Sequence, residues 1–330
     1  MGLQEIGEFG FIRRIRKKFP LSSTVPIGIG DDTAAIVPSG NKYLLLTTDS
    51  LLESIHFDLS FSSFYQIGYK AVSVNISDVA AMGGTPRYFL ISLGLNKRVD
   101  VGDLDRLYGG IRKGARETET ELIGGNTAFS KGPFFISLTM VGDVPRKEVV
   151  KRSGAKAGDA LYVTGTLGEA SAGLEMLKKE ISPKLFPRLV RRYQTPQARW
   201  REGSLLARKA IPSAMIDLSD GLVSDLNHLA EESGVGAELD LKAIPITPSL
   251  RRFAHQAGRN PLEYALRGGE DYELLFSVPP KKIRKLESLL QDRLIRATRI
   301  GTITRRGLFV RSEGKLQRIE PHGYDHFRSP

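Results

Sequence analysis

The chain has 330 residues, of which 41% are hydrophobic and 26% are charged, as expected for a globular protein with two domains. No apolar run approaches the roughly 20 residues that cross a bilayer, and the stretch 1–18 lacks an apolar signal core. We therefore expect no membrane segment and a cytoplasmic location. The absence of cysteine excludes disulfides, thiolate metal sites and a cysteine nucleophile.

The histidine positions and the net charge indicate which metals and partners the chain could bind. The five histidines are scattered, so any metal is expected to be a hard cation on oxygen ligands, Mg²⁺ above all. The net charge of +11 is compatible with nucleic acid, a polyanionic small substrate, or a solvated surface rich in charged residues. The basic residues are dispersed and not interleaved with aromatic ones, which favours the solvated surface and disfavours nucleic acid.

In the first half, hydrophobic periodicity and turn signals predict alternating helices and strands. The expected helices span 5–19, 64–82 and 103–117, and the expected strands span 34–37, 42–48, 87–95, 122–127 and 134–144. Strands 34–37 and 42–48 flank the turn sequence Pro38-Ser39-Gly40-Asn41, which predicts a hairpin. The segment 122–127 is expected to be a strand that runs into a glycine loop with the oxygen-bearing side chains Asn126 and Thr127. The segment 145–150 is the expected domain junction.

The second half shows the same alternation, without an internal repeat. Helices are expected at 168–180, 198–209, 222–230 and 281–290, strands at 161–165, 214–217, 236–241, 273–278, 299–303 and 308–310, and a connector at 183–196. Strands and helices alternating along the whole chain predict an α/β fold. We place the two domains at 1–146 and 147–330.

Two glycines run directly into two carboxylates at Gly28-Ile29-Gly30-Asp31-Asp32. Neighbouring anions repel each other, and glycines allow a ligand to approach the backbone closely. Such a loop suits a divalent cation and, through the cation, a phosphate. An ordinary solvated turn would use the same residue types.

Other oxygen-rich positions follow apolar stretches. The segment Thr47-Thr48-Asp49-Ser50 combines three hydroxyls with a carboxylate, which suits Mg²⁺ or its bound waters, although the same residues are good helix N-caps. Asn75 and Asp78 share one face of a helix that is poor in Lys and Glu. A buried Asp78 would need a cation or hydrogen bonds.

Asp217 ends a predicted strand, and Asp220 or Ser219 just after it would serve as a cap for the next helix. The capping role does not account for Asp217. The basic loop 152–159 suits a phosphate contact or a surface turn, and 267–272 is a further glycine–acid loop. No Walker A loop and no protein-kinase motif set is present. A phosphate site without these motifs can still work by holding several Mg²⁺ ions on carboxylates. Spacing alone leaves open whether these carboxylates converge.

Taken in order, several segments resemble the thiamine-monophosphate kinase family of the aminoimidazole ribonucleotide synthetase-like superfamily, over essentially the whole chain. They are Gly28–Asp32, Thr48-Asp49, Val74–Gly83, Gly124–Thr127, Arg152–Ala155, Ile216–Leu222, Gly268–Glu273 and Gly323–Phe327. The resemblance implies a two-domain α/β (α+β) fold whose N-terminal mixed sheet pairs across a homodimer. It also implies ATP-dependent phosphorylation of thiamine monophosphate to thiamine diphosphate, by direct in-line transfer assisted by several Mg²⁺ ions.

The resemblance further implies roles for individual residues. The expected catalytic and metal-binding carboxylates are Asp32, Asp49, Asp78, Asp217 and Asp220. The additional Mg²⁺ ligands would be Thr47, Thr48 and Asn126, the ATP contacts Tyr108, Gly125, Asn126, Arg152 and Ser219, and the thiamine contacts His56, Glu270 and Tyr324. Domain 1–146 would bind ATP and Mg²⁺ and form the dimer, for which the hairpin 34–48 is the expected surface. Domain 147–330 would complete the nucleotide and substrate site.

One position departs from the family pattern, since Asn126 stands where the family usually has aspartate. Asparagine offers a metal a carbonyl oxygen but no charge, so we expect one Mg²⁺ to be held more weakly. Selenophosphate synthetase and HypE, which share the superfamily, need a reactive cysteine or selenocysteine that this chain lacks. Aminoimidazole ribonucleotide synthetase is compatible with the expected fold but matches the motifs poorly. A nucleic-acid-binding protein and a catalytically inactive phosphate sensor are the remaining alternatives.

Overall fold

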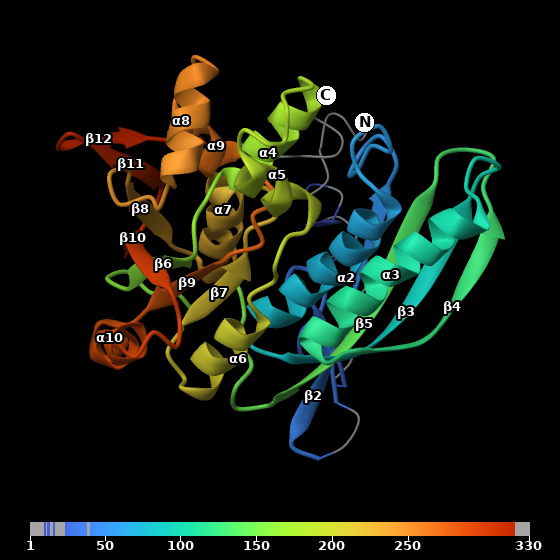
Figure 1. The fold of residues 1–330 in the computed structure, drawn as a ribbon. Helices are drawn as coiled ribbons and strands as arrows, with labels where there is room; N and C mark the ends of the chain where they lie inside the picture. Colours follow the sequence, from blue (N-terminus) through green and yellow to red (C-terminus); the bar gives the residue numbers. More distant parts are fainter. Residues whose placement is uncertain (1–9, 11, 14–15, 17–23, 38–39, 321–330) are drawn as a thin grey trace.

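The computed structural model describes residues 10, 12, 13, 16, 24–37 and 40–320. Most of the predicted helix 5–19, and Tyr324, lie outside these residues. The described chain forms two α/β halves side by side, each built on its own mixed sheet (Figure 1). None of the helices in this part of the chain combines the length and apolarity needed to cross a bilayer.

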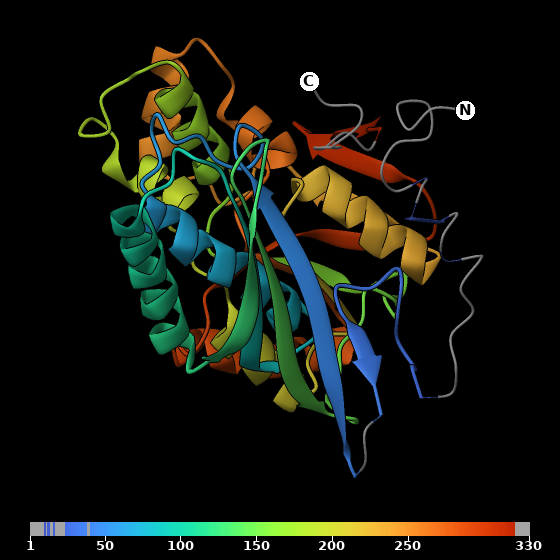
Figure 2. The same cartoon turned by 90° about the vertical axis from the view of Figure 1, so that its right-hand side faces the viewer.

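The first sheet has the strand order β1-β2-β5-β3-β4. Its strands are β1 (Ala34–Ile36), β2 (Lys42–Leu52), β3 (Thr85–Leu95), β4 (Glu121–Phe129) and β5 (Phe135–Pro145). The predicted hairpin is confirmed, because Ala34 pairs with Leu46 in an antiparallel register. Strand β2 runs beside β5 as far as Leu52 (Figure 2), beyond its predicted end at residue 48. Thr47, Thr48 and Asp49 therefore lie within a strand and cap no helix.

Two helices, α2 (Phe64–Ala81) and α3 (Val101–Thr118), cover one face of this sheet (Figure 1). They approach closely, since a Cβ at Gly110 would lie 1.8 Å from the carbonyl oxygen of Tyr65. Helix α2 also packs against the second half, where its Ala80 joins the same apolar cluster as Leu206 and Met215. Contact on both sides explains why this helix carries few charged residues.

The second sheet has the strand order β12-β11-β8-β10-β6-β9-β7. Its strands are β6 (Ala160–Thr164), β7 (Ala214–Asp217), β8 (Gly236–Asp240), β9 (Leu274–Val278), β10 (Ala297–Thr304), β11 (Leu308–Ser312) and β12 (Lys315–Arg318). The helices of this half are α4 (Glu169–Lys178), α5 (Pro187–Gln194), α6 (Trp200–Arg208), α7 (Leu222–Ser233), α8 (Pro248–Gln256), α9 (Pro261–Arg267) and α10 (Ile283–Gln291), the last preceded by the 3₁₀ turn η1 (Pro280–Lys282). Most predicted elements of this half are present with shifted ends.

Several elements differ from the prediction. The expected connector 183–196 contains helix α5, and helices α8 and α9 and strand β12 lie where no element was predicted. Helices α8 and α9 each begin at a capping side chain followed by proline, Thr247-Pro248 and Asn260-Pro261, a start signal that was available in the sequence. The glycines expected in a loop, Gly124 and Gly125, lie within strand β4.

Candidate active site

A cavity of about 490 Å³ lies between the two halves. Strand β2, helix α2 and the loop before β1 contribute to it from the first half, and the ends of several second-half elements complete it. Its polar lining residues include Asp31, Asp32, Thr47, Thr48, Asp49, His56, Asp78, Arg152, Asp217, Ser219, Asp220 and Glu270. The fold thus brings together most of the residues that the motifs single out.

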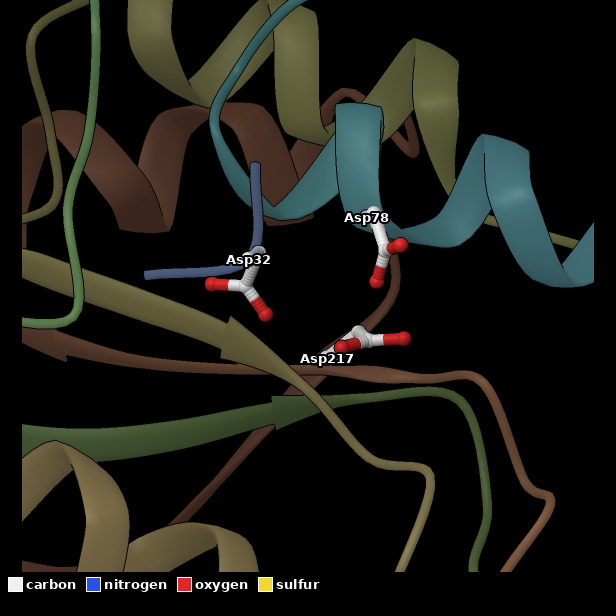
Figure 3. Close-up of side chains that lie close together, drawn as sticks. All are labelled: Asp32, Asp78 and Asp217. Carbon is white, nitrogen blue, oxygen red and sulfur yellow. The ribbon is translucent and has the colours of Figure 1, made fainter. Parts of the chain in front are cut away.

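Three carboxylates converge in the wall of this cavity (Figure 3). Oxygen atoms of Asp32, Asp78 and Asp217 all lie within 4.8 Å of one another. They come from the loop before β1, from α2 and from the end of β7. Oxygen ligands lie about 2.1 Å from Mg²⁺, so two opposite ligands of one ion are about 4 Å apart. Neighbouring ligands of one ion are about 3 Å apart. The three side chains therefore lie close enough to share one divalent cation once their oxygens turn toward it.

Polar groups of α2 and β2 join the two elements beside the cluster. The hydroxyl of Thr47 donates a hydrogen bond to Asp78. The side-chain oxygen of Asn75 accepts the backbone N–H of Asp49 at 3.2 Å. Asn75 and Asp78 therefore both face β2, as their spacing of three residues along the helix predicts.

Burial and mutual repulsion make the cluster unfavourable in the absence of a cation. Burial, together with the charges of Asp49, Asp217 and Asp32, raises the pKa of Asp78 well above its ordinary value. Burial and the charge of Asp32 also raise the pKa of Asp217, although the hydroxyl of Ser77 donates a hydrogen bond to this carboxylate. Carboxylates held together at such a cost are typical of functional sites.

Arg152 places a cation beside the cluster. Its guanidinium donates to both oxygens of Asp32, at 2.9 and 3.1 Å, and its backbone N–H donates to Asp31 at 3.3 Å. Burial lowers the pKa of Arg152, but the charge of Asp32 and its hydrogen bond outweigh this effect and raise it overall. Burial and the charge of Asp32 raise the pKa of Asp31 to about 7. The basic loop at 152–159 thus contacts the glycine–aspartate loop directly.

The interpretation of Asp220 or Ser219 as a helix cap is wrong. Helix α7 has Gly221 at its N-cap, without a side-chain cap bond. Instead, the carboxylate of Asp225 accepts the backbone N–H groups of Asp220 and Gly221, each at 3.2 Å. Helix capping therefore does not explain Asp220, which lines the cavity.

A second part of the cavity wall surrounds Glu270. This carboxylate pairs with the ammonium of Lys70 at 2.5 Å, and the same ammonium donates to the carbonyl of His56 at 3.1 Å. The ammonium also lies 4.1 Å from the ring centroid of Tyr193. Glu270 has a φ of +68°, which non-glycine residues rarely adopt, and its N–H donates to the carbonyl of Ser219. A carboxylate and an aromatic ring therefore border the cavity together.

Comparison with known proteins identifies the family. Residues 30–144 match the family model of the AIR synthase related protein N-terminal domain, and residues 156–312 match that of the C-terminal domain. The chain is 41% identical to a thiamine-monophosphate kinase of Aquifex aeolicus (strain VF5), over 99% of this chain and 100% of the relative. The chain belongs to the thiamine-monophosphate kinase family. A Bacillus subtilis (strain 168) member is 33% identical over 97% of this chain and 99% of its own length.

Solved structures of thiamine-monophosphate kinases share the fold. AaThiL complexed with AMPPCP and TMP is 40% identical, with a TM-score of 0.87 over 99% of both chains. The Stenotrophomonas maltophilia K279a enzyme is 33% identical, with a TM-score of 0.77 over 93% of this chain and 98% of its own. E. coli HypE, at 22% identity and a TM-score of 0.70 over 86% of this chain and 88% of its own, shows a similar fold alone.

Three residues that the family resemblance assigns to the nucleotide lie apart from the carboxylates. Tyr108 of α3 lines a different cavity, of about 620 Å³, and Gly125 and Asn126 belong to β4, which is exposed along its whole length. Strands β5 and β3 separate β4 from β2, which at the usual strand spacing is a distance of about 14 Å. The described chain does not bring these residues to the carboxylates by itself.

Lys70 and Tyr193 are among the groups at the cavity that were not predicted as site residues. A signal existed for Lys70, because Lys70 and Asp78 are the only charged residues of α2. A cation in a buried helix needs a partner. For Tyr193 no signal existed once the segment 183–196 was interpreted as a connector.

Proposed function

We propose that the chain transfers the γ-phosphoryl group of ATP to thiamine monophosphate, giving thiamine diphosphate and ADP. The observation that carries this proposal is the convergence of Asp32, Asp78 and Asp217 in the cavity of a chain whose relatives are thiamine-monophosphate kinases. The related AaThiL structure holds AMPPCP, an ATP analogue, together with TMP. Two phosphate-bearing substrates need positive charge where their phosphates meet, and carboxylates supply it by holding metal ions.

The proposed metal site uses oxygen donors from both halves. The proposed Mg²⁺ ligands are Asp32, Thr47, Thr48, Asp49, Asp78, Asn126, Asp217 and Asp220. Bound Mg²⁺ would neutralise the phosphate oxygens of both substrates. The acceptor phosphate is already anionic at neutral pH, so the chain needs no strong general base and no phosphoenzyme. Positioning and charge neutralisation lower the barrier.

Arg152 and Ser219 are proposed to bind the nucleotide, and His56, Glu270 and Tyr324 the thiamine part. The guanidinium of Arg152 is bidentate to Asp32 in this structure. A phosphate oxygen pair has the same bidentate geometry as a carboxylate. An entering phosphate can therefore replace Asp32 at Arg152, which leaves the Asp32 carboxylate available to a metal ion.

A homodimer would bring Tyr108, Gly125 and Asn126 of one subunit to the carboxylates of the other. Exposed apolar side chains gather on β3 and β4, at Tyr88, Leu90, Leu122, Ile123 and Phe129. An edge strand that is exposed along its whole length beside exposed apolar side chains is typical of an interface. We therefore favour β3 and β4, rather than the hairpin 34–48, as the dimer surface. Residues 1–146 would form the ATP-binding and dimerisation domain, 147–330 would complete the site, and the protein would act in the cytoplasm.

Release of ADP from ATP in the presence of Mg²⁺ and thiamine monophosphate tests the kinase activity. Thiamine in place of its monophosphate is the control, because it lacks the acceptor phosphate. We expect turnover with the monophosphate alone. A folded protein that releases no ADP with thiamine monophosphate would refute the proposed function.

Subunit mixing tests the shared site. We expect Asp217→Asn and Tyr108→Ala to be inactive separately, because each removes one contribution to every site. After unfolding and refolding together, mixed dimers would contain one site in which both residues are native, so activity should return. Failure to recover activity in verified mixed dimers would show that the site is not shared.

A further inference from the structure

The part of the cavity wall around Glu270 is organised by Lys70, to which the proposed function gives no role. The side chain of Lys70 lies on α2 and is only 3% exposed. Its ammonium contacts Glu270 at 2.5 Å, the His56 carbonyl at 3.1 Å and the Tyr193 ring at 4.1 Å. Lys70 is not among the residues that line the cavity, whereas all three of its partners are. Lys70 therefore contacts three lining groups from outside the cavity.

Fold stability alone does not explain this arrangement. Burial of an ammonium is costly, and a buried ion pair is often no more stabilising than apolar residues of the same volume. Glu270 adds backbone strain at a φ of +68°, and strain of this kind collects at ligand sites. The buried ion pair and the strained backbone both involve groups at one cavity. Their position therefore indicates a role in binding a ligand.

The contacts of Lys70 also join distant parts of the chain. Glu270 precedes β9 in the second half and Tyr193 belongs to α5, while Lys70 belongs to the first half. The hydroxyl of Tyr193 donates to the same His56 carbonyl at 3.2 Å. A single ammonium thus fixes a carboxylate and an aromatic ring side by side. These are the two groups that bind a cationic heteroaromatic ring, by charge and by stacking or cation–π contact.

We propose that Lys70 is a positioning residue that holds Glu270 and Tyr193 for the cationic ring system of thiamine monophosphate. The inference rests on the proposed function, because thiamine carries a thiazolium cation and an aminopyrimidine ring, whereas ATP carries no cationic ring. Lys70 does not touch the substrate and acts through Glu270. Without its ammonium, the Glu270 side chain turns toward solvent, and the affinity for thiamine monophosphate falls while that for ATP does not.

A double-mutant cycle of Lys70→Met and Glu270→Gln tests this role. Each single variant should raise the KM for thiamine monophosphate about tenfold, with the KM for ATP unchanged within about twofold. The double variant should match Glu270→Gln, because the two residues act as one unit. Arg98→Met is the matched control, since it removes the cation that pairs with the buried carboxylate of Glu53 at 2.8 Å in the same half. It should leave both KM values unchanged.

The outcomes separate this inference from the proposed function. If the wild type turns over, three results would overturn the inference alone. They are an unchanged KM for thiamine monophosphate in Lys70→Met, equal rises of the KM for thiamine monophosphate and for ATP, and a KM in the double variant that multiplies the two single effects. No turnover by the wild type would refute the proposed function and the inference with it. If Lys70→Met does not fold, the double variant Lys70→Met/Glu270→Met, which removes both charges, is compared with the single variant Glu270→Met. Equal KM values for thiamine monophosphate in these two variants support the inference. A higher KM in the double variant overturns it.

Discussion

The repulsion among the clustered carboxylates predicts opposite effects of Asp217→Asn with and without metal. Oxygens of Asp217, Asp78 and Asp32 lie within 4.8 Å of one another. Asparagine keeps the size of the side chain and can still accept the hydrogen bond from the Ser77 hydroxyl. The substitution therefore removes one negative charge and little else. The metal-free protein should become more stable, and its response to Mg²⁺ should weaken.

The magnitude follows from the spacing of the charges. At 4.8 Å and an effective dielectric constant of about 20, two unit charges repel by about 3.5 kcal/mol. Arg152 offsets part of this repulsion through Asp32, and the raised pKa of Asp217 means that a proton already relieves another part. We expect metal-free Asp217→Asn to be about 1–3 kcal/mol more stable than the wild type, which is a Tm rise of about 1–4 °C for a chain of 330 residues.

Thermal unfolding in EDTA and in a series of Mg²⁺ concentrations measures both effects. The wild type should gain about 2.7 kcal/mol at a Mg²⁺ concentration 100 times its Kd, and Asp217→Asn should gain much less and lose ADP release. Asp143→Asn is the matched control, because Asp143 pairs with Lys42 and Arg87 on the first sheet, away from the cavity. A variant that is less stable than the wild type in EDTA and keeps the full Mg²⁺ response would refute this reasoning.

Three further substitutions test other parts of the structure. Burial raises the pKa of Asp271 to about 7, so the stability that it contributes is complete below pH 4 and is lost as the pH rises toward 7. The free energy of unfolding of Asp271→Asn, relative to that of the wild type, should therefore increase by at most about 4 kcal/mol between pH 4 and 8. Parallel curves of unfolding free energy against pH for the two proteins would contradict this. Gly110→Ala should destabilise by about 1–3 kcal/mol, because its Cβ would lie 1.8 Å from a carbonyl oxygen of α2. Gly109→Ala should not destabilise the protein, because the nearest atom would lie 3.5 Å from its Cβ. Equal losses of stability in the two variants would refute the close helix contact. Asn126→Asp should lower the Mg²⁺ concentration at half-maximal activity, and identical curves would remove Asn126 from the metal site.

Local interactions explain what could be predicted from the sequence. The hairpin of β1 and β2 follows from a turn sequence between two apolar strands, and helix α2 follows from its apolar period. The absence of cysteine and the ordered acidic motifs predicted a hard cation for any metal and indicated the family. Each of these signals depends on residues near one another in the chain or on composition, so no tertiary contact was needed to find them.

Contacts between distant residues decided the rest. Asp32, Asp78 and Asp217 meet because α2 packs against both sheets and because β7 ends beside the loop before β1. Periodicity carries no information on such an approach, and the same carboxylates would be solvated in a different packing. The ion pair of Lys70 with Glu270 joins residues 200 positions apart. Only the folded chain shows that the Lys70 ammonium contacts a carboxylate of the cavity wall. The sequence by itself thus determined most of the elements and the oxygen-rich, acidic character of the site. Its geometry arose from the packing of the two halves, because side chains from separate elements acquire fixed distances only when those elements are in contact.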